Sequence, residues 1–178
     1  MLDSEAILEY AKSEDRINNG RVFLVGRSLG GAVATHTVAK LAEQENEWIR
    51  GLILENTFTS VSKMADSLFP FLKLIPNLKS RMLRLDWNSA KQIESIKSPI
   101  LIVAGSKDQL CPLAMSNELF ASAKGSKDKE FFLVQNGDHN NTYIIAEASY
   151  WMRVREFIDK CLGEKTNWVR PDSMIQIV

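Results

Sequence analysis

Four short apolar runs recur along the chain, and turn-forming residues bound each of them. The runs are continuous rather than alternating, and they are rich in β-branched and aromatic residues. This pattern is typical of strands that are covered on both faces, as in a parallel sheet. It predicts four strands, at Val22–Val25, Leu52–Leu54, Ile100–Ala104 and Phe131–Val134.

Between these runs lie segments with the periodicity of amphipathic helices. They predict helices from Asp3 or Ser4 to just before Gly20, over Leu29–Glu43, from Pro112 onward, and over Thr142–Leu162 with an end at Gly163. Their expected buried positions are Ile7, Tyr10 and Ala11 in the first, Met115, Leu119, Phe120 and Ala123 in the third, and Tyr150, Val154, Phe157 and Cys161 in the last. Strands thus alternate with helices, which predicts an α/β fold: a doubly wound, mainly parallel sheet with helices on both faces.

The length of 178 residues favours one domain with a substantial core. Residues 1–163 hold all the predicted strands and helices. Within them, residues 60–96 are apolar but interrupted by proline, with five basic and two acidic side chains from Ser60 to Asp86. We expect short helices there that cap one end of the sheet. The tail, residues 164–178, follows no pattern that predicts a structure.

Composition narrows the classes of function. The 22 basic and 22 acidic side chains cancel, and general nucleic-acid binding needs a basic surface. No run of 18 apolar residues predicts a membrane span, and the three acids and absent bases of Met1–Tyr10 argue against a signal peptide. Two cysteines, Cys111 and Cys161, fit a reducing compartment. We expect a soluble, intracellular chain with no cofactor, and its histidines and cysteines lack the spacing of a metal site.

The segment Gly26-Arg27-Ser28-Leu29-Gly30 follows one predicted strand and opens a predicted helix. It matches G-x-S-x-G, the nucleophile elbow, in which a sharp turn strains a serine and exposes its hydroxyl. Side chains at Gly26 and Gly30 are expected to clash across that turn. A phosphate-binding turn is the alternative, but the G-x-G-x-x-G spacing of a dinucleotide site and the G-K-[S/T] of a P-loop are absent.

A serine hydroxyl is a poor nucleophile at neutral pH and needs a base. His139 follows the last predicted strand, in a loop that leaves the strand's C-terminal end. His36, the other histidine, lies in the middle of a predicted helix and is interpreted as a surface or packing residue. His139 is therefore the candidate base, and a turn residue bonded to neighbouring backbone is its alternative reading.

The base needs an acid to orient it, and three carboxylates are candidates. Asp108 follows the third predicted strand, so it projects from the sheet edge where ligands of open α/β sheets collect. Glu55 ends the second strand at the same edge and is its rival. Asp138 adjoins His139 and is interpreted as a turn former. We favour Asp108, for which an N-cap of the next helix is the alternative role.

With these residues identified, the chain resembles serine hydrolases of the α/β-hydrolase fold, and most closely the α/β-hydrolase domain-containing protein 13 group with its bud-emergence relatives. The matching segments are Gly26–Ala34, Glu55–Phe58, Asp108–Pro112 and His139–Tyr143. The resemblance implies Ser28 as nucleophile, Asp108 as acid, His139 as base and the Leu29 N–H as an oxyanion donor. It also implies hydrolysis of an ester or thioester, with protein depalmitoylation suggested for related members.

A complete fold of this family has several strands before the elbow, and a loop containing His-Gly that supplies the second oxyanion donor. Only 27 residues precede Ser28, so we expect the C-terminal part of an α/β-hydrolase fold, without the membrane anchor of full-length relatives. Losing one oxyanion donor typically costs about a hundred- to a thousandfold in turnover. The Val22–Val25 strand is then an exposed edge that could pair with a second copy of the chain.

Three functions stay open at this point. The first is a serine hydrolase of esters or thioesters, whose apolar and basic cap holds an acyl chain or touches an anionic membrane surface. The second is a weak or inactive remnant, or an interaction module, that lacks the oxyanion loop. The third is a serine peptidase of the prolyl-oligopeptidase type.

Overall fold

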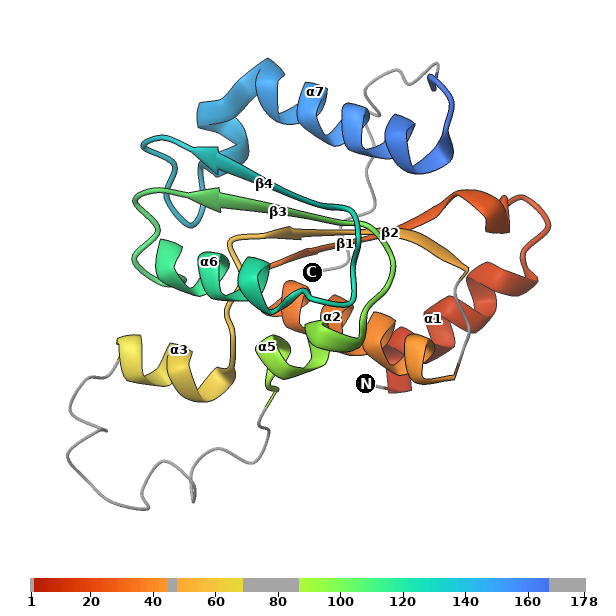
Figure 1. Cartoon of the computed structure of the whole chain (residues 1–178), viewed down its shortest axis with the longest axis horizontal. Coiled ribbons are helices and arrows are strands. Elements are labelled where there is room, and N and C mark those ends of the chain that lie inside the picture. Colours follow the sequence, from red (N-terminus) through yellow and green to blue (C-terminus); the bar gives the residue numbers. More distant parts are fainter. Residues whose placement is uncertain (1, 45–47, 69–86, 167–178) are drawn as a thin grey trace.

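The computed structural model describes residues 2–44, 48–68 and 87–166 of the chain. Its centre is a sheet of four parallel strands in the order β1-β2-β3-β4 (Figure 1). The strands are β1 (Val22–Arg27), β2 (Ile49–Glu55), β3 (Ile100–Gly105) and β4 (Lys129–Val134). All four predicted strands are confirmed, and each is longer than the apolar run that predicted it.

Helices cover both faces of this sheet, as the alternation of elements predicted. α2 (Leu29–Glu43), α5 (Ser89–Gln92) and α6 (Leu113–Ser122) lie on one face, and α7 (Thr142–Leu162) lies on the other (Figure 1). Alternate residues of a strand point to opposite faces. In β2, Leu52 and Leu54 pack in the core beneath α2 and α6, whereas Ile53 packs against α7. Every residue of β3 is buried, which confirms the two-sided burial that its apolar run predicted.

Two helices match their predicted limits closely. α2 spans the predicted residues, and α7 ends at Gly163, whose φ of 68° places it in the left-handed conformation that ends many helices. α7 also contains a break that the sequence did not reveal. Glu147 has a φ of 45° and a ψ of −124°, so two helical segments meet there. An exposed glutamate carries no signal for such a break.

The prediction for the first helix is wrong at its end and on its buried face. α1 (Leu2–Ser13) ends well before Gly20, which lies in the 3₁₀ turn η1 (Asn19–Arg21). The Asn18 side chain accepts the Gly20 N–H and begins that turn. Ile7 and Tyr10 are exposed, because α1 packs through Leu8 and through an ion pair to α2.

Residues 60–96 leave the sheet after β2 and return before β3. α3 (Val61–Leu68), α5 and the 3₁₀ turn η3 (Ile93–Ser95) are short helices of the predicted kind. A bridge between Ser60 and Asn88 closes the base of this excursion. About half of the predicted cap, residues 69–86, lies outside the described residues, as do residues 167–178 of the tail. No helix in the described parts is long and apolar enough to cross a bilayer.

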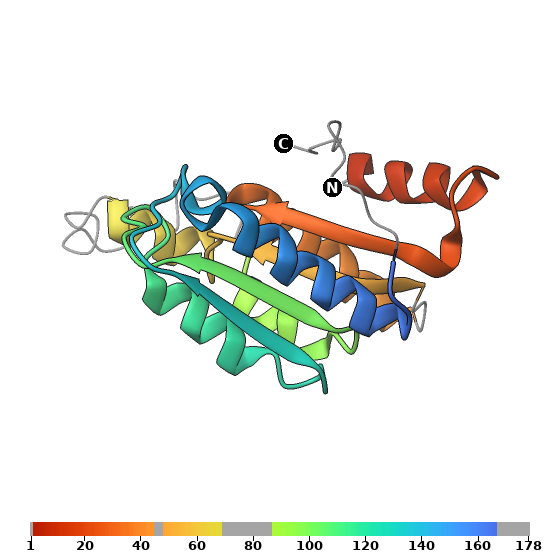
Figure 2. The same cartoon turned by 90° about the horizontal axis from the view of Figure 1, so that it is seen from above.

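All four strands point the same way, so their C-terminal ends meet at one edge of the sheet. Ser28 directly follows β1, Glu55 ends β2, and the loops after β3 and β4 carry Asp108 and His139. Figure 2, which looks onto α7, shows β1 and β4 at the two borders of the sheet. The fold therefore brings every candidate residue to the same edge, as the sequence predicted.

Candidate active site

The elbow gives Ser28 a conformation that few non-glycine residues adopt. Its φ is 51° and its ψ is −121°, which is a strained combination for a residue with a side chain. Ser28 occupies the N-cap position of α2 but makes no side-chain capping bond, so its hydroxyl is available to other groups. A Cβ on Gly26 would lie 2.5 Å from the Gly30 carbonyl oxygen. The predicted need for a glycine at position 26 is confirmed.

A third glycine, Gly31, is also needed for close packing, although the sequence did not single it out. A Cβ there would lie 2.5 Å from the Thr57 side chain. Thr57 follows β2, and its hydroxyl donates to the Ser28 carbonyl oxygen at 2.6 Å. The Ser28 N–H donates to the Glu55 carbonyl at 3.0 Å. The strained residue is thus bonded to the end of β2 on both sides.

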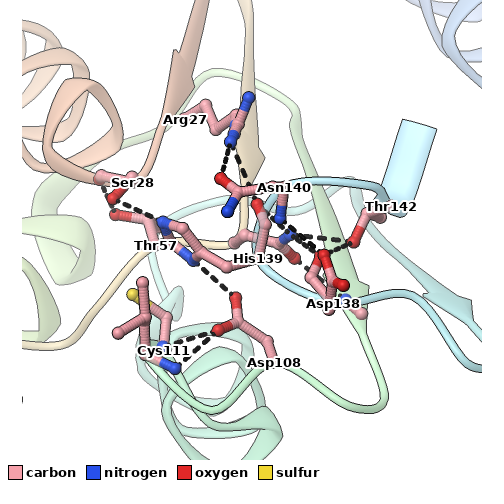
Figure 3. A network of polar contacts seen from close by, with 12 residues as sticks. Arg27, Ser28, Thr57, Asp108, Cys111, Asp138, His139, Asn140 and Thr142 are labelled. Atoms are coloured by element: carbon pink, nitrogen blue, oxygen red, sulfur yellow. Dashed lines mark hydrogen bonds and ion pairs between the residues drawn. The ribbon is translucent and has the colours of Figure 1, made fainter. Parts of the chain in front are cut away.

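His139 lies between Ser28 and Asp108 (Figure 3). Its Nε2 is 3.0 Å from Ser28 Oγ, and its Nδ1 is 2.8 Å from Asp108 Oδ2. The Asp108 side chain is 1% exposed and the His139 side chain 13%. When Nδ1 carries the proton that Asp108 accepts, Nε2 is free to accept the serine proton. The geometry therefore allows His139 to act as a base toward Ser28.

The loop after β3 orients Asp108 through its second oxygen. Oδ1 accepts the N–H groups of Leu110 and Cys111 at 2.9 and 2.8 Å, just before α6 begins. One oxygen therefore orders the turn before the helix, while the other faces His139, and the alternative reading of Asp108 as the N-cap of this helix is wrong. Pro112, rather than Asp108, occupies the N-cap of α6.

The loop after β4 holds His139 through its neighbours. Asp138 accepts the N–H groups of Asn140 and Asn141, which confirms its role as a turn former. Arg27 also contacts this loop, and Nη2 donates to the His139 carbonyl at 3.1 Å and to Asn140 Oδ1 at 2.8 Å (Figure 3). Nothing in the sequence pointed to Arg27, because a variable position of G-x-S-x-G carries no signal of its own.

The rival acid, Glu55, has a different partner. Its Oε2 accepts the hydroxyl proton of Tyr150, from α7, at 2.7 Å, while the buried Oε1 has no hydrogen-bond partner among the described residues. Burial raises the pKa of the Glu55 carboxyl, although the Tyr150 bond and the charges of Arg27 and His139 oppose that shift. Burial beside Glu55 likewise raises the pKa of Tyr150. Asp108, not Glu55, is the carboxyl group that contacts His139.

Cys111 lies beside Asp108 and His139. Its sulfur and ligand atoms of Asp108 and His139 lie within 4.8 Å of one another, which is close enough to surround a metal ion. Burial raises the pKa of the Cys111 thiol to about 12, and a protonated thiol is a poor ligand. Asp108 and His139 are moreover bonded to each other. These contacts suit a hydrogen-bonded chain of Ser28, His139 and Asp108, called the relay below, better than a metal centre.

An open hollow of about 420 Å³ lies next to His139, with Lys107, Leu110 and Asp138 in its lining.

His36, by contrast, lies away from the site, and its Nδ1 is 2.8 Å from Gln92 Nε2. That contact fits the packing role predicted for it. Leu29, at the start of α2, follows Ser28 directly. Its role as an oxyanion donor and the catalytic roles of Ser28 and its two partners stay predictions.

A strained serine on a strand-to-helix elbow, at the C-terminal edge of a parallel sheet with helices on both faces, defines an α/β-hydrolase fold. A model of the prolyl oligopeptidase family matches residues 1–165. The chain belongs to this family.

Relatives and solved structures agree with this assignment. The chain is 32% identical over 172 residues to the α/β hydrolase domain-containing protein WAV2 of Arabidopsis thaliana, covering 92% of this chain and 54% of the relative. It is 34% identical to protein bem46 of Schizosaccharomyces pombe, covering 88% and 50%. The chain thus spans about half the length of these curated relatives, and the resemblance to the bud-emergence group is confirmed.

Two kinds of solved hydrolase share the fold. An esterase of Pyrococcus furiosus superposes with a TM-score of 0.71 at 19% identity, over 91% of this chain and 61% of the esterase. An acylaminoacyl peptidase of Pyrococcus horikoshii superposes with a TM-score of 0.64 at 15% identity, over 92% and 28%. Both likenesses concern the fold alone.

Proposed function

We propose that this chain hydrolyses carboxylic esters or thioesters through an acyl-enzyme on Ser28. The observation that carries the proposal is the continuous contact from Ser28 Oγ through His139 to Asp108, at 3.0 and 2.8 Å. These three side chains come from three separate loops, and their assembly around an elbow serine is the arrangement that activates a hydroxyl.

The reaction has two steps. His139 Nε2 takes the Ser28 proton as Oγ attacks the carbonyl carbon, and it then gives that proton to the leaving oxygen or sulfur. In the second step His139 takes a proton from the water that attacks the acyl carbon, and it gives that proton to Ser28 Oγ as the bond between Oγ and the acyl carbon breaks and the carboxylic acid leaves. Asp108 stabilises the imidazolium that forms in each step. The Leu29 N–H, in the first turn of α2, is the donor assigned to the developing oxyanion.

Apolar surface beside the relay supports an acyl substrate. Leu29 and Leu110 are 54% and 41% exposed, and each lies within two residues of Ser28 or Asp108. Esters and thioesters also have better leaving groups than amides, which makes them the less demanding substrates for a site with one assigned oxyanion donor. A thioester on a protein, such as a palmitoylated cysteine, is the finer form of this proposal.

The experiment is labelling by a fluorophosphonate probe, followed by hydrolysis of p-nitrophenyl esters and acyl thioesters of increasing chain length. We expect labelling that Ser28→Ala abolishes. Ser95→Ala is the matched control, because Ser95 is exposed in η3. η3 leads into the N-terminal end of β3, at the edge of the sheet opposite to the candidate site. A chain that the probe does not label, or that is labelled equally after Ser28→Ala, would overturn the proposal.

A peptidase is the second candidate, and the prolyl oligopeptidase family match favours it. Acyl-aminoacyl p-nitroanilides separate the two, because only a peptidase releases the aniline at a rate comparable with ester hydrolysis. A weak or inactive remnant, the alternative that the sequence left open, gives a third outcome in which neither substrate turns over. Two further predictions stay untested. One is membrane contact through residues 60–96, and the other is pairing of two chains through β1, where Val25 is exposed.

A further inference from the structure

Asn56, the residue after β2, lies where the two loops that carry Asp108 and His139 meet. It is 1% exposed. Its side-chain oxygen Oδ1 accepts the Gly105 N–H at 2.9 Å. Gly105 is the last residue of β3 and lies three positions before Asp108. This hydrogen bond therefore fixes the start of the acid-bearing loop to the end of β2.

The side-chain nitrogen of Asn56 reaches the other loop. Nδ2 donates to the Asp138 carbonyl at 3.0 Å, to the His139 carbonyl at 3.3 Å and to Thr142 Oγ1 at 2.8 Å. The Thr142 hydroxyl in turn donates to the Asp138 carbonyl at 2.6 Å. One buried amide thus bonds the loop before Asp108 with its oxygen and the loop around His139 with its nitrogen.

The backbone at this position also selects asparagine. Asn56 has a φ of 44°, in the left-handed region where asparagine is among the best tolerated residues after glycine. Its N–H donates to the Val103 carbonyl at 3.0 Å, so β3 holds the residue in place. Its two neighbours, Glu55 and Thr57, bond the backbone of Ser28 on either side.

We propose that Asn56 is a positioning residue, whose side-chain amide keeps Asp108 and His139 in register with Ser28. This proposal rests on the proposed function, because Asn56 acts only through the relay. Aspartate has no N–H to donate to the His139 loop, and alanine or glycine makes none of these bonds. A donor and an acceptor on one short side chain are needed, since the two loops present opposite groups.

The test uses NMR of the His139 ring in the full chain labelled with ¹⁵N-histidine. The chain has two histidines, so His36 provides an internal reference. We expect the wild type to show a low-field Nδ1 proton on His139, as its contact with Asp108 requires. In Asn56→Gly, which keeps the backbone conformation accessible, we expect that proton to exchange with water faster by about tenfold or more, the effect of losing a hydrogen bond network of this size.

The matched control is Asn136→Gly. Asn136 also has a positive φ, of 63°, and it lies in the β4–α7 loop, but its side chain is exposed. We expect Asn136→Gly to leave the His139 proton unchanged. If Asn56→Gly lowers thermal stability while the His139 signal stays as in the wild type, Asn56 is structural only and the proposal is wrong. A wild type without the Nδ1 proton also overturns it.

A second pair of variants serves if Asn56→Gly does not fold. Thr142→Val keeps the shape of the side chain but removes the hydroxyl that bonds Asn56, and Thr142→Ser keeps the hydroxyl. We expect faster exchange of the His139 proton in the valine variant and the wild-type rate in the serine variant. Equal signals in the two would refute the proposal.

Fluorophosphonate labelling separates this proposal from the proposed function. If the wild type is labelled, we expect the labelling rate to fall about tenfold or more in Asn56→Gly and to stay unchanged in Asn136→Gly. If the wild type is not labelled, the proposed function fails, while the His139 resonances still decide whether Asn56 positions the ring.

Discussion

The buried Glu55–Tyr150 pair makes a testable prediction about pH. Glu55 is buried, and within the part of the chain that the structure describes only one of its two carboxyl oxygens has a hydrogen-bond partner. Burial therefore raises the pKa of its carboxyl above the ordinary value of 4.5. In the folded chain Glu55 keeps its proton at pH values where the unfolded chain has released it. We predict that this residue makes the folded chain less stable as the pH rises above 4.5.

The sign and size follow from proton linkage. Between pH 4.5 and the raised pKa, the folded state binds up to one proton more than the unfolded state. The free energy of unfolding then falls by up to about 1.4 kcal/mol per pH unit. The contribution of Glu55 is fully present below pH 4.5 and is lost as the pH rises through the pKa of the folded state. Glu55→Gln still offers an oxygen to Tyr150 but has no proton to release, so its slope is absent.

The assay is urea unfolding of the wild type and Glu55→Gln from pH 4 to pH 8 at constant ionic strength. We expect the variant to gain stability relative to the wild type as the pH rises, with a constant difference below pH 4.5. Glu9→Gln is the control, because Glu9 is exposed on α1. A difference between Glu55→Gln and wild type that does not change with pH would show that Glu55 is ionised in the folded chain.

Two further predictions concern the elbow and the relay. Gly26→Ala is expected to cost about 3 kcal/mol of stability or more by urea unfolding, because its Cβ would lie 2.5 Å from the Gly30 carbonyl oxygen. Gly163→Ala is the control, because no described residue lies within 4 Å of the added carbon. It should cost about 1 kcal/mol, and equal costs would refute the clash. Asp108→Asn keeps an oxygen for the turn but disfavours the Nδ1-protonated tautomer of His139. We therefore expect the rate of ester hydrolysis to fall about 10⁴-fold at unchanged stability. A fall of less than about tenfold would exclude the orienting role of Asp108.

The sequence predicted the sheet and the main helices because each depends on local signals. The continuous runs at Ile100–Ala104 and Leu52–Leu54 contain no polar side chain. They therefore predicted strands that are buried on both faces. α2 begins at the glycine turn of the elbow, and α7 ends at Gly163. Both are strong local signals for a helix end. Ser28 and His139 could be placed at one edge because parallel strands end together.

The parts that the sequence did not predict depend on contacts between distant segments. Asn56 reads as an ordinary turn residue, and its bonds to Gly105 and Thr142 exist only after three strand ends have met. Arg27 occupies a position that the elbow motif leaves free, yet it bonds the His139 loop. The early end of α1 differs from these, because Gly20 belongs to a separate turn that the Asn18 side chain begins by accepting the Gly20 N–H.

The choice between the two strand-end acids is the clearest case. Asp108 and Glu55 both follow apolar strands, and the spacing of neither one excludes it as the partner of His139. Helix α7 decides between them, because it places the Tyr150 hydroxyl 2.7 Å from Glu55 and leaves Asp108 to face the imidazole at 2.8 Å. Asp108 is bonded at both oxygens, which fixes its plane, whereas one Glu55 oxygen has no partner in residues 2–44, 48–68 and 87–166. A carboxylate that must orient a histidine needs a fixed plane, so the hydrogen bonds around each acid identify the relay member more surely than its place in the chain.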